Sequence, residues 1–279
     1  MRRGAACRAL FVVALATAAS GCASAFREHT TPFPPSAPRT VPWTLDRELL
    51  MPVTRRILVV VEVEKGHPPE RYALDRLVTV AARYGERPAS WVALGGDGAP
   101  RFRFDGDRLV ADGALDPMTS YVLVRYVADG IDGWGLSYTL VARGHAVHVI
   151  EINQERHRRW SWFLPERHLE AQTLVHEYGH HLGLPPCDHG YYRDFPDFSD
   201  GAHCVNPDCA LAKPRLRALL YGFGHVVLAH HWLEDYCAQC RAAVAAAKAY
   251  WRYLKVPSAS QRSPLHSCTD AMSPSPSGA

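Results

Sequence analysis

The segment 165–183 constrains this chain most, because it combines a helical pattern with two histidines placed to share one ligand. It contains the pattern H-E-x-x-H, formed by His176, Glu177 and His180. Histidines four residues apart lie on the same helix face, one turn from each other, so both imidazoles can bind one zinc ion. Glu177 then lies beside the open coordination position, where it can accept a proton from an activated water.

The sequence around the motif supports a helix. Pro165 and Glu166 suit a first helical turn, and Gly183 followed by two prolines ends the helix. Apolar residues recur at helical spacing and predict a buried stripe: Ala171, Leu174, Val175, Tyr178 and Leu182. A solvated helix with incidental histidines is the alternative. The pattern favours a zinc-dependent peptidase that hydrolyses peptide bonds through a metal-activated water, with Glu177 as general base and acid.

Two cysteine pairs form a second constellation. Four residues separate Cys204 from Cys209, and two residues separate Cys237 from Cys240. Two such pairs a few dozen residues apart indicate a structural zinc site with four thiolate ligands. Disulfides, which exported proteins often form, are the alternative for the same cysteines. A C-x-x-C sequence also occurs in thiol–disulfide proteins, which are a further alternative.

The order of these motifs resembles the archaemetzincins, members of the metzincin clan of metallopeptidases. That family reads H-E-x-x-H-x-x-G-x-x-H-C, followed by C-x-M after four residues and later by C-x-x-C. The resemblance implies one catalytic zinc held by three histidines and one structural zinc held by four cysteines. The matching residues here are His176, His180 and His203 for the first, and Cys204, Cys209, Cys237 and Cys240 for the second.

The chain departs from the family pattern at three points. Pro186 stands where the third histidine is expected, so His203 is the preferred third ligand and His189 is the alternative. Leu211 replaces the methionine of the clan's Met-turn. The distance from Leu211 to Cys237 along the chain is also longer than in the family.

The strand and helix patterns predict an α/β (α+β) fold, in which a metzincin-like mixed sheet is backed by two helices. A loop-rich and helical C-terminal subdomain follows. Strands are predicted at 57–63, 91–94, 101–104, 121–126, 136–141 and 147–152, and helices at 68–85, 165–183, 216–233 and 241–254. Strand 147–152 is expected to line the cleft and pair with an extended substrate, with a plain core strand as the alternative. Residues 156–162 are expected to form a basic, aromatic loop.

The N-terminal segment has the features of an export signal. Arg2 and Arg3 precede the apolar run 10–18, which is shorter than a membrane-spanning helix. The small residues before Cys22 resemble the lipobox of bacterial lipoproteins, which implies cleavage before Cys22 and its lipidation. A secretory signal cut a few residues later is the alternative. The protein is therefore expected in the cell envelope, anchored to a membrane by lipid, or else secreted.

Four segments are expected along the chain, one of them a domain with two subdomains. They are a lipoprotein signal peptide (1–21), a Pro-rich tether (22–42), a metallopeptidase domain (43–256, with subdomains 43–183 and 184–256) and a disordered tail (257–279). A net charge of +3 gives no reason to expect a nucleic-acid partner, so the expected partners are a peptide or protein substrate and a membrane. The main alternative function is a non-catalytic, membrane-tethered zinc-binding protein.

Overall fold

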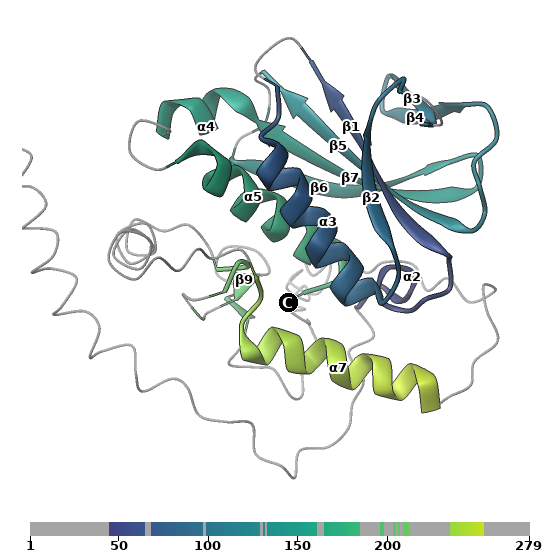
Figure 1. The fold of residues 1–279 in the computed structure, drawn as a ribbon, viewed down its shortest axis with the longest axis vertical. Helices are drawn as coiled ribbons and strands as arrows, with labels where there is room; N and C mark the ends of the chain where they lie inside the picture. Colours follow the sequence, from purple (N-terminus) through teal and green to yellow (C-terminus); the bar gives the residue numbers. More distant parts are fainter. Residues whose placement is uncertain are drawn as a thin grey trace, which may run out of the picture.

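A five-stranded mixed sheet with helices packed against one face forms the body of the protein (Figure 1). The computed structural model describes residues 45–64, 68–96, 99–128, 131, 133–160, 165–184, 196–197, 203–204, 206, 209–212 and 235–253. The predicted α/β class of fold is confirmed within these residues. The predicted signal, tether and tail, the helix predicted at 216–233, and Cys22, Pro186 and His189 all lie outside them.

The order of the strands in the sheet is β2-β1-β5-β7-β6. Neighbours are parallel except β6 and β7, which run antiparallel. Strands buried on both faces are rich in Val, Leu and Ile, as parallel strands covered on both sides require. The bounds are β1 (Arg56–Val63), β2 (Ala89–Ala93), β5 (Thr119–Val127), β6 (Gly135–Ala142) and β7 (His145–Asn153).

The place of β7 corrects one expectation from the sequence. β7 lies between β5 and β6 and pairs with both, so its backbone is not available to an extended substrate. The edge next to β7 is β6, whose outer side pairs with no strand in the part of the chain that the structure describes. Both stretches have the pattern of a strand, and that pattern does not encode the order of strands in a sheet.

Two helices, α3 (Arg71–Gly85) and α5 (Glu166–His181), lie side by side on one face of the sheet (Figure 1). Their apolar faces share one buried cluster with alternate side chains of β1, such as Ile57 and Val59. The β1 side chains that point the other way, Leu58 and Val60, form a second cluster under a hairpin. That hairpin consists of β3 (Arg101–Asp105) and β4 (Arg108–Asp112).

The shorter elements complete the frame around α5. Asp46 directly precedes α2 (Arg47–Leu50) in the sequence. Its backbone N–H donates to the carbonyl of Leu182 and so holds the end of α5 in place. Helix α4 (Gln154–Trp160) replaces most of the basic loop predicted at 156–162, so that prediction is wrong. Its residues are good helix formers, and Arg159 pairs with Glu155 one turn away.

The segments after α5 are short until the last helix. They include β8 (Pro196–Asp197) and β9 (His203–Cys204), which pair with each other, and then α7 (Ala238–Tyr253). Helix α7 begins before the predicted start at residue 241, which places Cys240 in its first turn.

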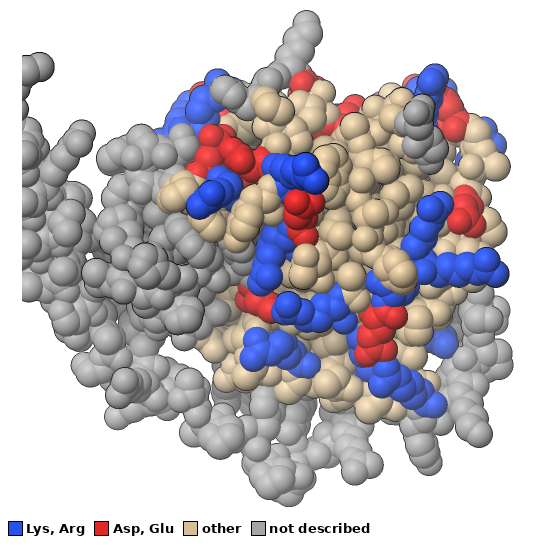
Figure 2. All heavy atoms as spheres, in the orientation of Figure 1, with Lys and Arg blue, Asp and Glu red and all other residues tan. Residues whose placement is uncertain are grey.

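Ion pairs join α3 to α7 and to the residue Asp235 that precedes α7. Figure 2 shows basic and acidic side chains interspersed over one face of the molecule. Glu86, at the end of α3, pairs with Lys248 and Arg252 of α7, and Asp235 pairs with Arg83. Among the described residues, no helix is both long enough and apolar enough to cross a membrane.

Candidate metal centres

The end of α5 is shaped by Gly183, as the sequence predicts. Gly183 has a φ of 78°, a left-handed conformation that glycine adopts without steric cost. Its N–H donates to the carbonyl of His180, and the N–H of Leu184 donates to the carbonyl of Gly179, both at 2.9 Å. These two bonds form the usual glycine-terminated helix end, so α5 stops directly after its second motif histidine. The predicted apolar stripe of α5 is buried against the sheet.

Three half-buried imidazoles meet beside α5. The ring nitrogens of His176, His180 and His203 all lie within 4.8 Å of one another. The two Nε2 atoms of His176 and His180 are 3.1 Å apart. His203 comes from β9, and its ring centroid lies 5.2 Å from that of His176 and 5.3 Å from that of His180. The structure therefore brings the preferred third histidine to the two motif histidines, although it lies far from them in the sequence.

Hydrogen bonds on the outer side of the rings orient this centre. Nδ1 of His176 donates to the carbonyl of Ala210 at 2.7 Å, which fixes the proton on Nδ1 and leaves the lone pair of Nε2 facing His180. Burial lowers the pKa of His176, and it lowers the pKa of His180 well below the usual value. Both rings are therefore neutral at pH 7, which is the protonation state that a metal requires.

Glu177 is held beside the imidazoles by the edge strand β6. Ser137 donates to its Oε2 at 2.8 Å, and the side chain is only 7% exposed. A Cβ on Gly135 would lie 2.8 Å from Glu177 and 2.9 Å from Thr173, so the close approach of β6 to α5 requires glycine there. Burial raises the pKa of Glu177 to about 7, and the Ser137 hydrogen bond and the charge of His203 oppose this shift.

Four thiols form a second centre next to the first. The sulfurs of Cys204, Cys209, Cys237 and Cys240 lie within 4.8 Å of one another, and all four cysteines are buried and free. The Sγ–Sγ distances are 3.8 Å for Cys204 and Cys237 and 3.6 Å for Cys209 and Cys240. A disulfide requires about 2.05 Å, so the structure holds these cysteines as separate thiols.

Both donor sets consist of ligand types that bind zinc, and three of their separations can be compared with those of a tetrahedral site. Tetrahedral zinc with Zn–S bonds of about 2.3 Å places its sulfurs roughly 3.8 Å apart, and Zn–N bonds of about 2.0–2.1 Å place its nitrogens roughly 3.4 Å apart. The measured separations of 3.6–3.8 Å for sulfur and 3.1 Å for nitrogen lie close to these values. The two clusters can therefore each hold a metal ion, and all seven donors are residues expected from the sequence.

The sequence did not indicate the groups that support these donors. The carbonyl of Ala210 and the hydroxyl of Ser137 lie 34 and 40 residues from their partners on α5. Neither contact could be inferred from local patterns, because each depends on how distant segments pack against α5. For Gly135 a signal did exist, since a glycine at the start of a strand often marks a close approach of another element.

Gly179 lets the segment with Ala210 and Leu211 pack closely against α5. A Cβ on Gly179 would lie 2.8 Å from both the Leu211 and the Tyr236 side chains. Leu211 is fully buried, and Tyr236, which donates from its hydroxyl to the carbonyl of Val175 at 2.9 Å, is 1% exposed. Leu211 therefore packs directly against the helix that carries His176 and His180.

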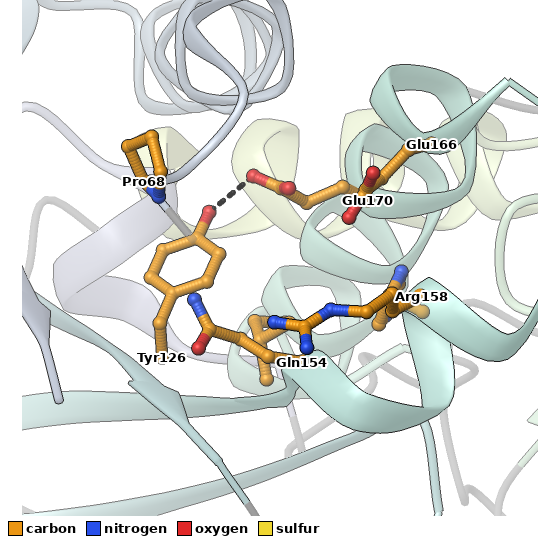
Figure 3. Close-up of a pocket in the computed structure, with 8 residues that line it drawn as sticks. Pro68, Tyr126, Gln154, Arg158, Glu166 and Glu170 are labelled. Carbon is orange, nitrogen blue, oxygen red and sulfur yellow. Dashed lines mark hydrogen bonds between the residues drawn. The ribbon is translucent and has the colours of Figure 1, made fainter. Parts of the chain in front are cut away.

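A polar pocket lies near the first turns of α5, and its lining includes Tyr126, Glu166 and Glu170 (Figure 3). Within it, the hydroxyl of Tyr126 donates to Glu170 at 2.5 Å, and the backbone N–H of Glu70 also donates to this carboxylate. Burial raises the pKa of Glu170 to about 8, against the effect of these hydrogen bonds, and the charges of Glu70 and Glu166 raise it further. Glu170 is therefore largely protonated at neutral pH.

Comparisons with known proteins found no match. No protein-family model matches the chain, and no curated protein or solved structure matches it significantly.

Replacing Gly179 with alanine tests the packing beneath the histidine helix. Alanine favours a helix interior by about 1 kcal/mol over glycine, but here its methyl group must displace two buried side chains. We expect Gly179→Ala to lower the free energy of unfolding by about 1–3 kcal/mol, as overpacking does. Chemical denaturation measures this change.

A double variant provides the control. Leu211→Ala alone is expected to cost about 2–5 kcal/mol, but it also makes room for the methyl group at residue 179. The double variant Gly179→Ala/Leu211→Ala should then cost less than the sum of the single changes. Strict additivity, or a neutral Gly179→Ala, would show that the two side chains do not compete for space.

The raised pKa of Glu170 predicts a pH-dependent stability. Between the ordinary carboxyl pKa and about 8, the folded protein binds more protons than the unfolded chain, so stability is highest at low pH and falls as pH rises through this window. The expected slope is on the order of 1 kcal/mol per pH unit. Glu170→Gln should flatten the profile from pH 5 to 8 relative to wild type, measured by denaturation at each pH.

Tyr126→Phe tests the same carboxyl group by raising its pKa further. It removes a hydrogen bond that lowers the pKa of Glu170, so the loss of stability should extend to higher pH than in wild type. A Glu170→Gln profile identical to that of wild type would exclude Glu170 as the titrating group.

Proposed function

We propose that this protein is a zinc-dependent peptidase in which Glu177 acts as general base and general acid. The observation that carries the proposal is the position of Glu177, whose buried carboxylate adjoins a centre with three imidazoles and no fourth protein donor among the described residues. Structural zinc sites are usually closed by four protein ligands, whereas catalytic sites keep one position open. Membership of the metzincin clan, implied by the motif order, is part of this proposal.

The reaction proposed is hydrolysis of a peptide bond. The chemistry that a bound zinc supplies at such a centre is Lewis acidity, which activates water and polarises a carbonyl oxygen. Glu177 accepts the proton from the attacking water and then donates it to the departing amine. Ser137 holds one carboxylate oxygen, so the other oxygen is oriented for this proton transfer. His176 is kept in the tautomer that presents Nε2 by its bond to Ala210.

The outer side of β6 is proposed as the surface that binds the substrate. Positive φ angles at Arg143 and Gly144 define a two-residue turn between β6 and β7. In such a hairpin the two residues that flank the turn form a hydrogen-bonded pair, and bonded and unbonded pairs then alternate along the strands. Ser137 and Thr139 belong to unbonded pairs, so their backbone N–H and C=O groups point away from β7. An extended peptide can add to this edge as a further strand and reach Glu177, which Ser137 contacts.

Export and membrane anchoring complete the proposal. The N-terminal pattern described above supports lipidation at Cys22, which would place the peptidase at a membrane of the cell envelope. Mass analysis of the mature protein tests this directly, because a diacylglyceryl group on Cys22 adds a defined mass. An unmodified N-terminus produced by cleavage a few residues later would favour secretion instead.

Replacing the proposed base tests the peptidase assignment. Glu177→Gln keeps the shape of the side chain and the hydrogen-bond partner Ser137 but cannot accept a proton. We expect cleavage of a mixed-sequence peptide library, followed by mass spectrometry, to fall roughly 10²–10⁴-fold, while the zinc content measured by metal analysis stays unchanged.

The control is Glu155→Gln, an exposed change on α4, which should leave cleavage intact. A zinc-loaded wild type that cleaves no member of the library would favour the alternative function, a non-catalytic zinc-binding protein. Cleavage that survives in Glu177→Gln would exclude Glu177 as the base.

A proline on β6 tests the proposed substrate edge. Thr139→Pro removes an outward-facing N–H, which an edge strand tolerates without losing a bond to its neighbour in the sheet. We expect the protein to fold and the specificity constant kcat/KM for library peptides to fall about tenfold, the equivalent of one main-chain hydrogen bond. Thr139→Val keeps the N–H and removes only the hydroxyl, so equal losses in both variants would contradict strand pairing at this edge.

A further inference from the structure

The two metal centres are built on the same short stretches of chain. In β9, His203 belongs to the imidazole cluster, and Cys204, the next residue, belongs to the thiol cluster. Successive residues of a strand point to opposite faces, so one two-residue strand contributes a donor to each centre. The orientation of His203 therefore depends on how Cys204 is held.

A second link joins Cys209 to the orientation of His176. Cys209 is followed by Ala210, whose carbonyl accepts the hydrogen bond from Nδ1 of His176 at 2.7 Å. Residues 209–212 form a turn that is held to β9 by a backbone bond, in which the N–H of Cys204 donates to the carbonyl of Leu211 at 2.9 Å. A shift of Cys209 would therefore move the group that sets the tautomer of a motif histidine.

A third link runs through Tyr236 and Cys237. Tyr236 is buried beneath α5, and its hydroxyl donates to the carbonyl of Val175, the residue before His176. Its neighbour Cys237 belongs to the thiol cluster, and the N–H of Cys237 donates to Sγ of Cys209 at 3.3 Å. Three of the four cysteines are thus immediate neighbours of residues that contribute to or support the imidazole centre.

The segments that carry these links have little regular structure to hold them in place. β9 has two residues, and the stretch 209–212 forms a turn. A strand pair this short is not stable by itself. A tetrathiolate metal site, in contrast, contributes on the order of 10 kcal/mol to the folding of small domains. Bonds from the thiols to a metal ion would add to the backbone hydrogen bonds of these segments and to the packing of Leu211, and would so fix His203 and Ala210 more tightly.

We propose that the cysteine centre is the positioning element of the imidazole centre, so that occupancy of the thiols by a divalent cation sets the metal affinity of the three histidines. The inference rests on the metal binding in the proposed function, but it does not depend on peptidase activity. Metal loading is then ordered: the thiols fill first, and the imidazoles acquire their full affinity only afterwards.

Cobalt titration of the reduced full-length protein tests this order. Thiolate-bound Co²⁺ gives an intense ligand-to-metal charge-transfer band, whereas Co²⁺ held by imidazoles gives only weak ligand-field bands, so the two centres are read separately. In wild type we expect the charge-transfer band to saturate before the imidazole band rises. Filling of the imidazole centre first would overturn the proposal.

The double variant Cys209→Ser/Cys240→Ser tests the dependence itself. We expect the affinity of the imidazole centre for Co²⁺ to fall roughly ten- to a hundredfold, the range found when groups that orient metal ligands are removed. Ala238→Ser, an exposed change within the same C-x-x-C turn, is the matched control and should leave both bands unchanged. An imidazole affinity within twofold of wild type in the folded double variant would overturn the proposal.

A measurement on the wild type covers the case in which the double variant does not fold. A thiol-specific mercurial is titrated into the zinc-loaded protein, and released zinc is followed with a chromophoric chelator. The proposal predicts that zinc from both centres is released together, while release from the thiols alone overturns it. If coupling is observed but no peptide is cleaved, the peptidase proposal fails and the coupling stands.

Discussion

The close packing beneath α5 is the constraint on which both candidate metal centres depend. Gly179 has no side chain, and this absence lets Leu211 and Tyr236 lie against the helix between His176 and His180. From that contact the chain continues to Ala210 and Cys209 on one side and to Cys237 on the other. The candidate metal ligands are thus arranged around a helix that is held in place by burial of its apolar stripe against the sheet.

The edge strand β6 approaches the same helix from the opposite direction. Gly135 allows the close contact, and Ser137 uses it to hold Glu177. An acid beside imidazoles is costly to bury, because burial favours its protonated form. Both Glu177 and Glu170 are buried with raised pKa values, but among the described residues only Glu177 lies beside a cluster of three imidazoles. Strongly shifted carboxyl groups are common at functional sites but are not restricted to them.

Sequence reasoning identified the donors better than their surroundings. The spacing of His176 and His180 follows directly from helix geometry, and the pairing of His203 with Cys204 followed from motif order. The central strands and α3 were also predictable, because their apolar patterns are long and regular. The prediction that β7 pairs with a substrate is wrong, since an inner strand and an edge strand have similar local sequence patterns. The loop predicted in place of helix α4 is also wrong, because the high charge of this segment resembles a solvated loop although its residues favour a helix.

The shared strand β9 has a consequence for how the chain finds its register. A shift of one residue would turn a thiol toward the imidazoles and an imidazole toward the thiols, since the side chains of a strand alternate between faces. Each cluster would then contain a donor of the wrong kind and geometry. The preference of a metal ion for matched ligands can therefore correct an error in strand pairing that two residues of backbone hydrogen bonding could not.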